Sequence, residues 1–266
     1  KTFAFGIPMV EHIDPESRDV QGLVLAPTRE LAIQIRDELR DLCAFKEGVR
    51  TVCLYGGQPI DKQITQLKKD PQIVVATPGR LMDHVKRRTV RLDKVQTVVL
   101  DEADRMLDMG FIHDVKKILK WLPEKKQTLF FSATMPKEIT ELVNSLLHHP
   151  ARVAVDPVSS PVEAIQQSVY FVDKGNKTKL LALLIGQLDV KNALVFTRTK
   201  HGANKVARDL SKEGITAAAI HGNKSQTARQ QALSDFKAGR IRCLVATDIA
   251  ARGLDIEELS HVFNYN

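Results

Sequence analysis

Short apolar runs, often of β-branched residues, alternate with helical patterns along nearly the whole chain of 266 residues. The runs are apolar at successive positions, which is typical of parallel strands buried on both faces. We expect strands over Leu23–Ala26, Thr51–Tyr55, Ile73–Ala76, Thr97–Leu100, Thr128–Phe131 and Arg152–Val155, and then over Ser168–Val172, Ala193–Phe196, Ala217–Ile220 and Cys243–Ala246. The last six residues, HVFNYN, are typical of one more strand.

Between these runs, apolar side chains recur at helical spacing. One such face consists of Leu31, Ile35, Leu39 and Leu42, a second of Ile139, Leu142, Val143 and Leu146, and further helices are expected over Lys179–Leu188 and Gln226–Phe236. Regular alternation of strands and helices predicts an α/β fold with parallel sheets flanked by helices.

The alternation is interrupted once, by the stretch DPVSSPVEA at Asp156–Ala164. Two prolines and two serines without apolar periodicity are typical of a linker. The sequence therefore predicts two tandem domains of the same class, over residues 1–155 and 164–266, joined by a linker at 156–163.

Composition narrows the class of protein. The chain is 43% hydrophobic and 27% charged, has no apolar run of the roughly 18 residues that a membrane span needs, and has no leader pattern, so we expect a soluble protein. Its three cysteines lack the spacing of a zinc site or a disulfide framework, which favours reduced thiols and a cytoplasmic location. A net charge of +7, spread over both halves, favours a polyanionic partner or a solvated surface.

Candidate chemistry gathers after the expected strands, where ligands bind in parallel sheets. Asp101, Glu102, Ala103 and Asp104 follow one of them directly. A carboxylate there suits Mg²⁺ and a second one can activate water, although acidic residues also stabilise the first turn of an ordinary helix. Ser132 and Thr134 follow the next strand and either relay hydrogen bonds or cap the helix after it.

Other strand ends carry glycine, threonine and arginine, which suit binding to a phosphate backbone but are also common in turns. These stretches are PTREL (27–31), YGG (55–57) and TPGR (77–80), then VFTRTK (195–200), HGNKSQTAR (221–229) and ATDIAARGLDI (246–256). At the start of the chain, Lys1 and Thr2 fit either the end of a phosphate-binding loop or the exposed start of a helix.

In this order and spacing the stretches resemble the DEAD-box family of ATP-dependent RNA helicases. The motifs that carry the resemblance are PTRELA (27–32), GG (56–57), TPGR (77–80), DEAD (101–104), SAT (132–134), QxxR (226–229) and ARGLD (251–255). The resemblance implies two tandem RecA-like domains, ATP and Mg²⁺ as cofactors, RNA as partner, and non-processive unwinding or remodelling of ribonucleoproteins. Degradosome or ribosome-assembly proteins are implied as further partners.

The resemblance also assigns roles to residues. For nucleotide and metal, Lys1 would reach the β/γ-phosphates, Thr2 and Asp101 would hold Mg²⁺, Glu102 would act on the attacking water, and Gly253 and Asp255 would approach ATP from the second domain. Asp104, Ser132 and Thr134 would couple the nucleotide state to RNA. The RNA backbone would contact Thr28, Arg29, Gly57, Thr77, Gly79 and Arg80 in the first domain and Thr199, Gln226, Arg229, Thr247 and Asp248 in the second.

Three family segments do not occur in this sequence: the upstream glutamine segment that reads adenine, the glycine-rich part of the phosphate loop, and the stretch that supplies an arginine finger. We therefore expect a fragment at both ends. An arginine finger is worth about 10³ to 10⁵ in rate, so the 266 residues alone should hydrolyse ATP poorly.

Three other readings compete with a helicase: an ATP-gated RNA clamp with little unwinding, a DNA translocase, and a binding protein for small solutes. The clamp would use the same motifs, the translocase fits DEAD and SAT less well, and the solute-binding protein leaves the acidic motif unexplained.

Overall fold

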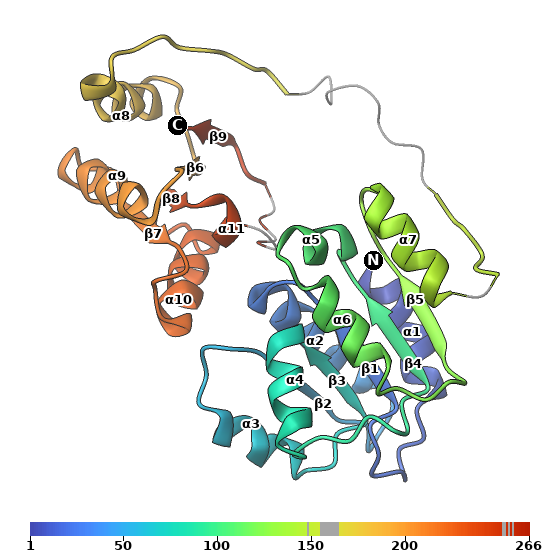
Figure 1. The fold of residues 1–266 in the computed structure, drawn as a ribbon. Coiled ribbons are helices and arrows are strands. Elements are labelled where there is room, and N and C mark those ends of the chain that lie inside the picture. Colours follow the sequence, from blue (N-terminus) through green and yellow to red (C-terminus); the bar gives the residue numbers. More distant parts are fainter. Residues whose placement is uncertain (148, 155–164, 252–253, 255, 257) are drawn as a thin grey trace. The chain divides into compact units, whose positions relative to one another are not determined.

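The computed structural model describes residues 1–147, 149–154, 165–251, 254, 256 and 258–266 (Figure 1). These residues form two compact units, one built mainly from the described residues up to Leu147 and the other from most of those that follow. Each unit contains a fully parallel sheet with helices packed on it, as the alternating pattern predicts.

The first unit alternates helices and strands in chain order. Its elements are α1 (Thr2–His12), β1 (Gly22–Leu25), α2 (Arg29–Cys43), β2 (Thr51–Leu54), α3 (Ile60–Leu67), β3 (Ile73–Ala76), α4 (Pro78–Lys86), β4 (Thr97–Leu100), α5 (Ala103–Asp108), α6 (Ile112–Leu119), β5 (Gln127–Phe130) and α7 (Lys137–Leu146). The five expected strands up to Phe131 are thus present, with ends shifted by at most one residue.

The first sheet has the strand order β2-β3-β1-β4-β5, with every neighbouring pair parallel. Alternate side chains point to opposite faces, so each face has its own core. Val24, Val75 and Val99 pack with α1 and α2 on one face. On the other face Leu25, Ala76 and Leu100 pack with helices α3 to α7 (Figure 1). Burial on both faces explains why β1 and β3 are apolar at every position after the first glycine of β1.

The second unit repeats the architecture with fewer strands. Its described elements are η1 (Lys174–Asn176), α8 (Lys177–Gln187), β6 (Ala193–Phe196), α9 (Lys200–Lys212), β7 (Ala217–Ile220), α10 (Gln226–Lys237), β8 (Cys243–Ala246), α11 (Asp248–Ala251) and β9 (His261–Asn264). The strand order is β7-β8-β6-β9, again all parallel. The last residues of the chain therefore form the strand that their pattern predicts.

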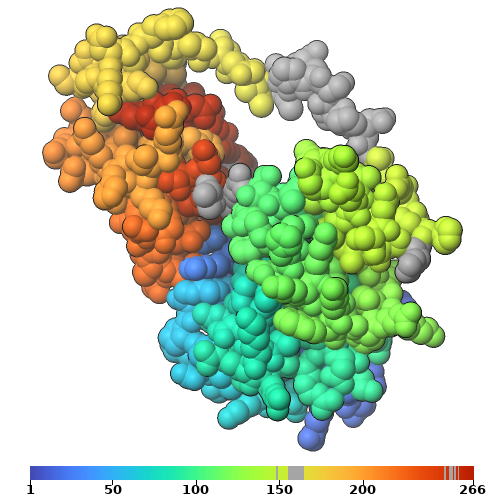
Figure 2. Space-filling model, in the orientation of Figure 1, coloured from blue at the N-terminus to red at the C-terminus, as the bar shows by residue number. Residues whose placement is uncertain are grey.

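Two expected strands are wrong. Ser168–Val172 forms no strand, and the described part of Arg152–Val155, residues 152–154, forms none either. Val169 and Phe171 are 81% and 96% exposed, and Figure 2 shows this stretch (yellow) at the surface. An isolated β-branched run has no neighbour to satisfy its backbone groups, and its composition alone does not make it a strand.

The expected linker at 156–163 lies outside the described residues, so the domain and linker boundaries stay predictions. Cys43, Cys53 and Cys243 are buried free thiols, as their spacing predicts. Burial raises their pKa to about 11, about 12 and about 11, so they remain protonated at neutral pH. Among the described helices, none is long and apolar enough to cross a membrane.

We expect Ile35→Ala to destabilise the first unit by about 2–5 kcal/mol, because Ile35 is fully buried between α2 and the sheet and its truncation leaves a cavity. Urea unfolding followed by the fluorescence of Trp121, the single tryptophan, reports on this unit. Phe45→Ala is the control. Since Phe45 is 92% exposed, a change larger than about 0.5 kcal/mol there would contradict this account of the core.

Candidate nucleotide and nucleic-acid site

The register of the first sheet aligns the ends of all five strands. Leu25 pairs with Ala76 and with Leu100, and these residues pair in turn with Leu54 and Phe130. The polar stretches that follow each strand therefore emerge along one edge of the sheet. This is the edge at which parallel α/β sheets bind ligands.

At the end of β4, Asp101 is only 2% exposed and carries two contacts on one carboxylate oxygen. The Oδ1 atom lies 3.3 Å from the ammonium of Lys1 and accepts a hydrogen bond of 3.0 Å from the backbone N–H of Glu102. The Lys1 side chain itself is 58% exposed. The start of α1 thus brings a solvent-exposed cation to a buried carboxylate.

Glu102 adopts an unusual backbone conformation, with φ 49° and ψ 51° in the left-handed region. Such strain costs on the order of 1–3 kcal/mol for a residue other than glycine, and it clusters at functional sites. Burial raises the pKa of Glu102, while the guanidinium of Arg105, 3.4 Å away, opposes that rise. The carboxylate is therefore a stronger proton acceptor than an ordinary glutamate.

Asp104 connects the ends of β4 and β5. Its Oδ2 atom accepts hydrogen bonds from the backbone N–H (3.0 Å) and the hydroxyl (2.9 Å) of Thr134, and its own N–H donates to Ser132 Oγ (3.2 Å). Burial opposes ionisation of Asp104, but the bonds from Thr134 and Ser132 more than compensate and lower its pKa. Of the two readings of these hydroxyls, helix capping is wrong, because α7 begins after Pro136 without a side-chain cap.

Three further turns line the same edge. Thr28 caps α2, accepting a hydrogen bond from Leu31 N (3.3 Å). The guanidinium of Arg29 lies against the glycine turn after β2, because a Cβ added to Gly57 would come within 2.3 Å of Arg29 Nη1. Gly57 also has φ +87°, so the fold itself requires glycine there.

Gly79 differs from Gly57 in this respect. It lies in the first turn of α4 behind Thr77, and a Cβ added to it would meet no atom within 4 Å. The fold would accept alanine at this position. The open space beside the helix N-terminus is available to a ligand that must approach the backbone closely.

Arg80 is held by residues that sequence reasoning missed. Its guanidinium donates from Nη1 and Nη2 to Gln58 O, each at 3.1 Å, and from Nη1 to Gln63 Oε1 at 3.1 Å. Gln63 and His84 are both fully buried. Each of them is a polar residue at an apolar position of a helical pattern: Gln63 lies between Ile60 and Leu67 in α3, and His84 follows Leu81 in α4. This mismatch in the pattern is the sequence signal that could have identified them.

The second unit repeats the arrangement at its own strand ends. Thr199 caps α9 by accepting from Gly202 N (3.0 Å), and Gln226 is buried at the first position of α10. The carbonyl of Thr247 accepts from Ala250 N and Ala251 N at the start of α11. Of the remaining predicted contacts in this unit, Asp248 is exposed and Arg229 half-buried. Gly253 and Asp255 lie outside the described residues.

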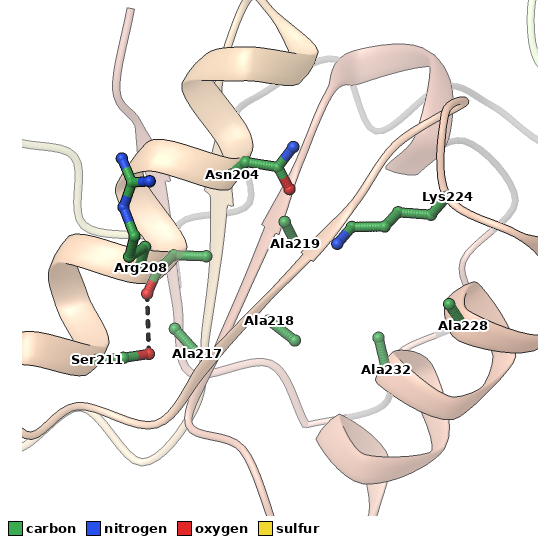
Figure 3. A pocket seen from close by; sticks show the side chains of 10 residues that line it. Asn204, Arg208, Ser211, Ala217, Ala218, Ala219, Lys224, Ala228 and Ala232 are labelled. Carbon is green, nitrogen blue, oxygen red and sulfur yellow. Dashed lines mark hydrogen bonds between the residues drawn. The ribbon is translucent and has the colours of Figure 1, made fainter.

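A groove of about 300 Å³ runs along β7, the edge strand of the second sheet, between α9 and α10 (Figure 3). Alanines form its floor, and Asn204, Arg208 and Lys224 lie at its sides. None of the predicted site residues lines it. Lys224 and Ala228 of the groove do belong to the stretch HGNKSQTAR (221–229), so the groove borders the predicted interface of this unit.

The chain belongs to the DEAD/DEAH box helicase family. The family model with that description matches residues 1–142, and the model described as helicase conserved C-terminal domain matches residues 176–266. The fold class is correspondingly that of tandem RecA-like domains.

Similar curated proteins carry helicase names. The DEAD-box ATP-dependent RNA helicase CshA of Bacillus subtilis is 48% identical over all of this chain and 54% of its own length, and the ATP-dependent RNA helicase CshA of Listeria monocytogenes is 47% identical over all of this chain and 51% of its own. The chain thus spans about half the length of the curated relatives it matches.

Solved structures agree in fold. Dbp5 of S. cerevisiae bound to RNA and ADP BeF3 is similar with a TM-score of 0.87 and 29% identity, over 100% of this chain and 67% of that one. A DEAD box protein from Methanococcus jannaschii is similar with a TM-score of 0.55 and 39% identity, over 100% of this chain and 71% of that one.

We expect Asp104→Asn to destabilise the first unit at pH 7 by about 1–2 kcal/mol, because hydrogen bonds to a charged acceptor are the stronger ones. Since the folded state lowers the pKa of Asp104, this stability is present above the ordinary aspartate pKa and is lost as pH falls through the folded value. Urea unfolding at several pH values should show the difference between variant and wild type shrinking below about pH 4. A difference that is constant with pH would contradict the role of the carboxylate.

Proposed function

We propose that this chain is the core of an ATP-dependent RNA helicase, which binds the RNA backbone and couples ATP hydrolysis to local, non-processive unwinding or remodelling. The observation that carries the proposal is the arrangement of three acidic residues, Asp101, Glu102 and Asp104, directly after β4. Each of the three has a different environment. Asp101 meets the cation of Lys1, Glu102 is strained and proton-accepting, and Asp104 binds Thr134 across to the next strand.

The donor set at this point fits Mg²⁺ bound together with nucleotide phosphates. Mg²⁺ uses one or two protein carboxylates or hydroxyls and takes its other ligands from phosphate and water. The buried carboxylate of Asp101 and the hydroxyl of Thr2 would be those ligands, and no cluster of three or more His, Cys, Asp or Glu ligands occurs in the described part of the chain. Bound Mg²⁺ would neutralise charge on the phosphates, and Lys1 would bind their β/γ oxygens.

Glu102 would orient the attacking water and accept its proton. A general base works best when its pKa is moved toward the working pH, and burial moves the pKa of Glu102 in that direction. Its left-handed backbone fixes the carboxylate at the junction of β4 and α5, next to Asp101.

RNA would bind along the strand ends of both units by its phosphates. Helix N-termini and the arginine fork provide donors for phosphate oxygens, and such contacts carry little sequence information. The residues proposed for these contacts are Thr28, Arg29, Gly57, Thr77, Gly79 and Arg80 in the first unit, and Thr199, Gln226, Arg229, Thr247 and Asp248 in the second. We also propose that Gly253 and Asp255 contact ATP.

Asp104 would link the two ligands. It joins the turn that carries Glu102 to Ser132 and Thr134 after β5, so a shift of the nucleotide turn would move both hydroxyl residues. The helicase names of the relatives favour unwinding over a passive RNA clamp, and displacement of one strand from a short duplex measures the difference. Ribonucleoprotein, degradosome or ribosome-assembly partners and a cytoplasmic location remain part of this proposal.

Glu102→Gln should lower RNA-stimulated ATP hydrolysis by about 10² to 10⁴ and leave RNA affinity unchanged, because the amide cannot accept the proton. Phosphate release should be measured with RNA, with DNA and with neither, on the 266-residue chain and on a form extended with the flanking segments of the Bacillus subtilis relative. RNA, and not DNA, should stimulate the extended form.

Glu138→Gln is the matched control, since Glu138 is an exposed acid in the first turn of α7. Its activity should equal that of the wild type. If the extended wild-type form showed no RNA-stimulated hydrolysis, the enzymatic proposal would be wrong.

Gly79→Ala should change RNA affinity without lowering the stability of the fold. The added methyl group meets no atom of the protein, so stability should be unchanged or higher by about 0.5–1 kcal/mol, as for a helical glycine replaced by alanine. RNA affinity should fall, because the methyl group occupies the space into which a phosphate approaches. Gly57→Ala should instead lower stability itself, since φ +87° and Arg29 exclude a side chain. Unchanged RNA affinity in Gly79→Ala would argue against backbone binding at α4.

A further inference from the structure

The turn after β2 is held on two sides by arginines. Arg29 packs its guanidinium against Gly56 and Gly57. Arg80 donates two hydrogen bonds to the carbonyl of the next residue, Gln58. Arginines from two of the predicted RNA-binding stretches therefore contact the turn that carries the glycines of a third.

The orientation of Gln63 follows from its neighbours. Its Nε2 lies 2.8 Å from the carbonyl of Tyr55, which can only accept, so the amide nitrogen must face that carbonyl. The Oε1 atom then faces both Arg80 Nη1, at 3.1 Å, and His84 Nε2, at 3.0 Å. Since Arg80 can only donate, Oε1 accepts from it.

His84 completes the network. With Gln63 Oε1 as acceptor, His84 carries its proton on Nε2. Its Nδ1 then faces the hydroxyl of Thr89 at 2.8 Å, and the single proton of that hydroxyl is shared between Nδ1 and the carbonyl of His84, 3.1 Å away. Burial, followed by the charge of Arg80, lowers the pKa of His84 and keeps the ring neutral. A neutral ring in this tautomer holds Gln63 without adding a second cation next to Arg80.

The bonds leave a defined part of Arg80 for a ligand. They use both N–H groups of Nη1 and one of Nη2. Among the described residues, none accepts a hydrogen bond from Nε. An Nε–H and an Nη2–H side by side form the fork that binds a phosphate with two parallel hydrogen bonds.

We propose that Gln63 is a positioning residue for the RNA backbone: its buried amide, held by His84 and Thr89, locks the inner side of the Arg80 guanidinium and turns the outer side toward a phosphate. The inference rests on the proposed binding of RNA. It adds to the RNA-binding site three residues that lie behind Arg80 and do not contact the RNA themselves, namely Gln63, His84 and Thr89.

Simple packing does not account for this arrangement. A buried amide costs free energy unless each group is bonded, and an apolar residue of the same size would fill the same space in α3 without that cost. The network instead satisfies the amide through the two groups that shape the interface, the Tyr55–Gln58 turn and Arg80.

The test is a double-mutant cycle on Gln63→Met and Arg80→Ala. Binding of a short labelled oligouridylate is measured by fluorescence anisotropy at several salt concentrations, with a non-hydrolysable ATP analogue present. Arg80→Ala should weaken binding about tenfold, and the slope of log affinity against log salt should decrease by about 0.7, as for one lost phosphate contact on a single strand. Gln63→Met should weaken binding about three- to tenfold and also flatten the slope, yet have no further effect when Arg80 is already alanine.

Gln66→Met is the matched control, an exposed glutamine on the same helix, and should bind as the wild type does. If Gln63→Met does not fold, Thr89→Val replaces it, because it removes only the hydroxyl that bonds His84 at the half-buried end of the network. It should show a smaller loss that also vanishes with Arg80→Ala.

The outcomes separate the inference from the function on which it rests. Equal losses for Gln63→Met with and without Arg80 would indicate a general structural role and overturn the inference. A loss for Arg80→Ala with none for Gln63→Met or Thr89→Val would overturn it as well, while leaving RNA binding intact. No binding by the wild type would overturn the RNA proposal itself.

Discussion

The parallel register of the first sheet is the constraint on which the site depends. Because Leu25, Leu54, Ala76, Leu100 and Phe130 lie in one row, every residue that follows a strand emerges at the same edge. Residues far apart in sequence are thereby brought together without long side chains, as Asp104 and Thr134 are across 30 positions. The apolar faces that fix the register are the same faces that bury the helices, so the core and the site are specified by one set of contacts.

At this edge of the sheet, the hydrogen bonds and ion pairs that satisfy the buried polar side chains also fix the positions of those side chains. Asp101 is buried and meets Lys1 and a backbone N–H, while Gln63 is buried and meets a carbonyl, an arginine and a histidine. In a medium of low dielectric each unmade bond is costly, so these groups have few alternative positions. Buried side chains that do not contact a polyanion can therefore still determine the geometry of the surface residues that would bind it.

Much of the fold was predictable because buried parallel strands are apolar at nearly every position, as in IVVA at Ile73–Ala76. Ser168–Val172 has the same composition and forms no strand, since a strand also needs a paired neighbour, which no local pattern reveals. The positions of the site residues after strands were likewise predictable, whereas the roles of Gln63 and His84 were not. Their bonds join α3, α4 and the turn after β2, and such contacts appear only when the helices are packed on the sheet.

The strained turn at Glu102 shows how one local geometry can serve two ligands. The left-handed residue is held from both sides: its own N–H donates to Asp101, and the N–H of Ala103 donates to the carbonyl of Phe131 at the end of β5. Phe131 directly precedes Ser132, which bonds back to Asp104. The turn that would act on nucleotide and the segment that would report it therefore share a short closed ring of hydrogen bonds. A ring of this kind cannot relax at one end alone, so a change of backbone conformation at Glu102 would also shift the hydroxyl residues after β5.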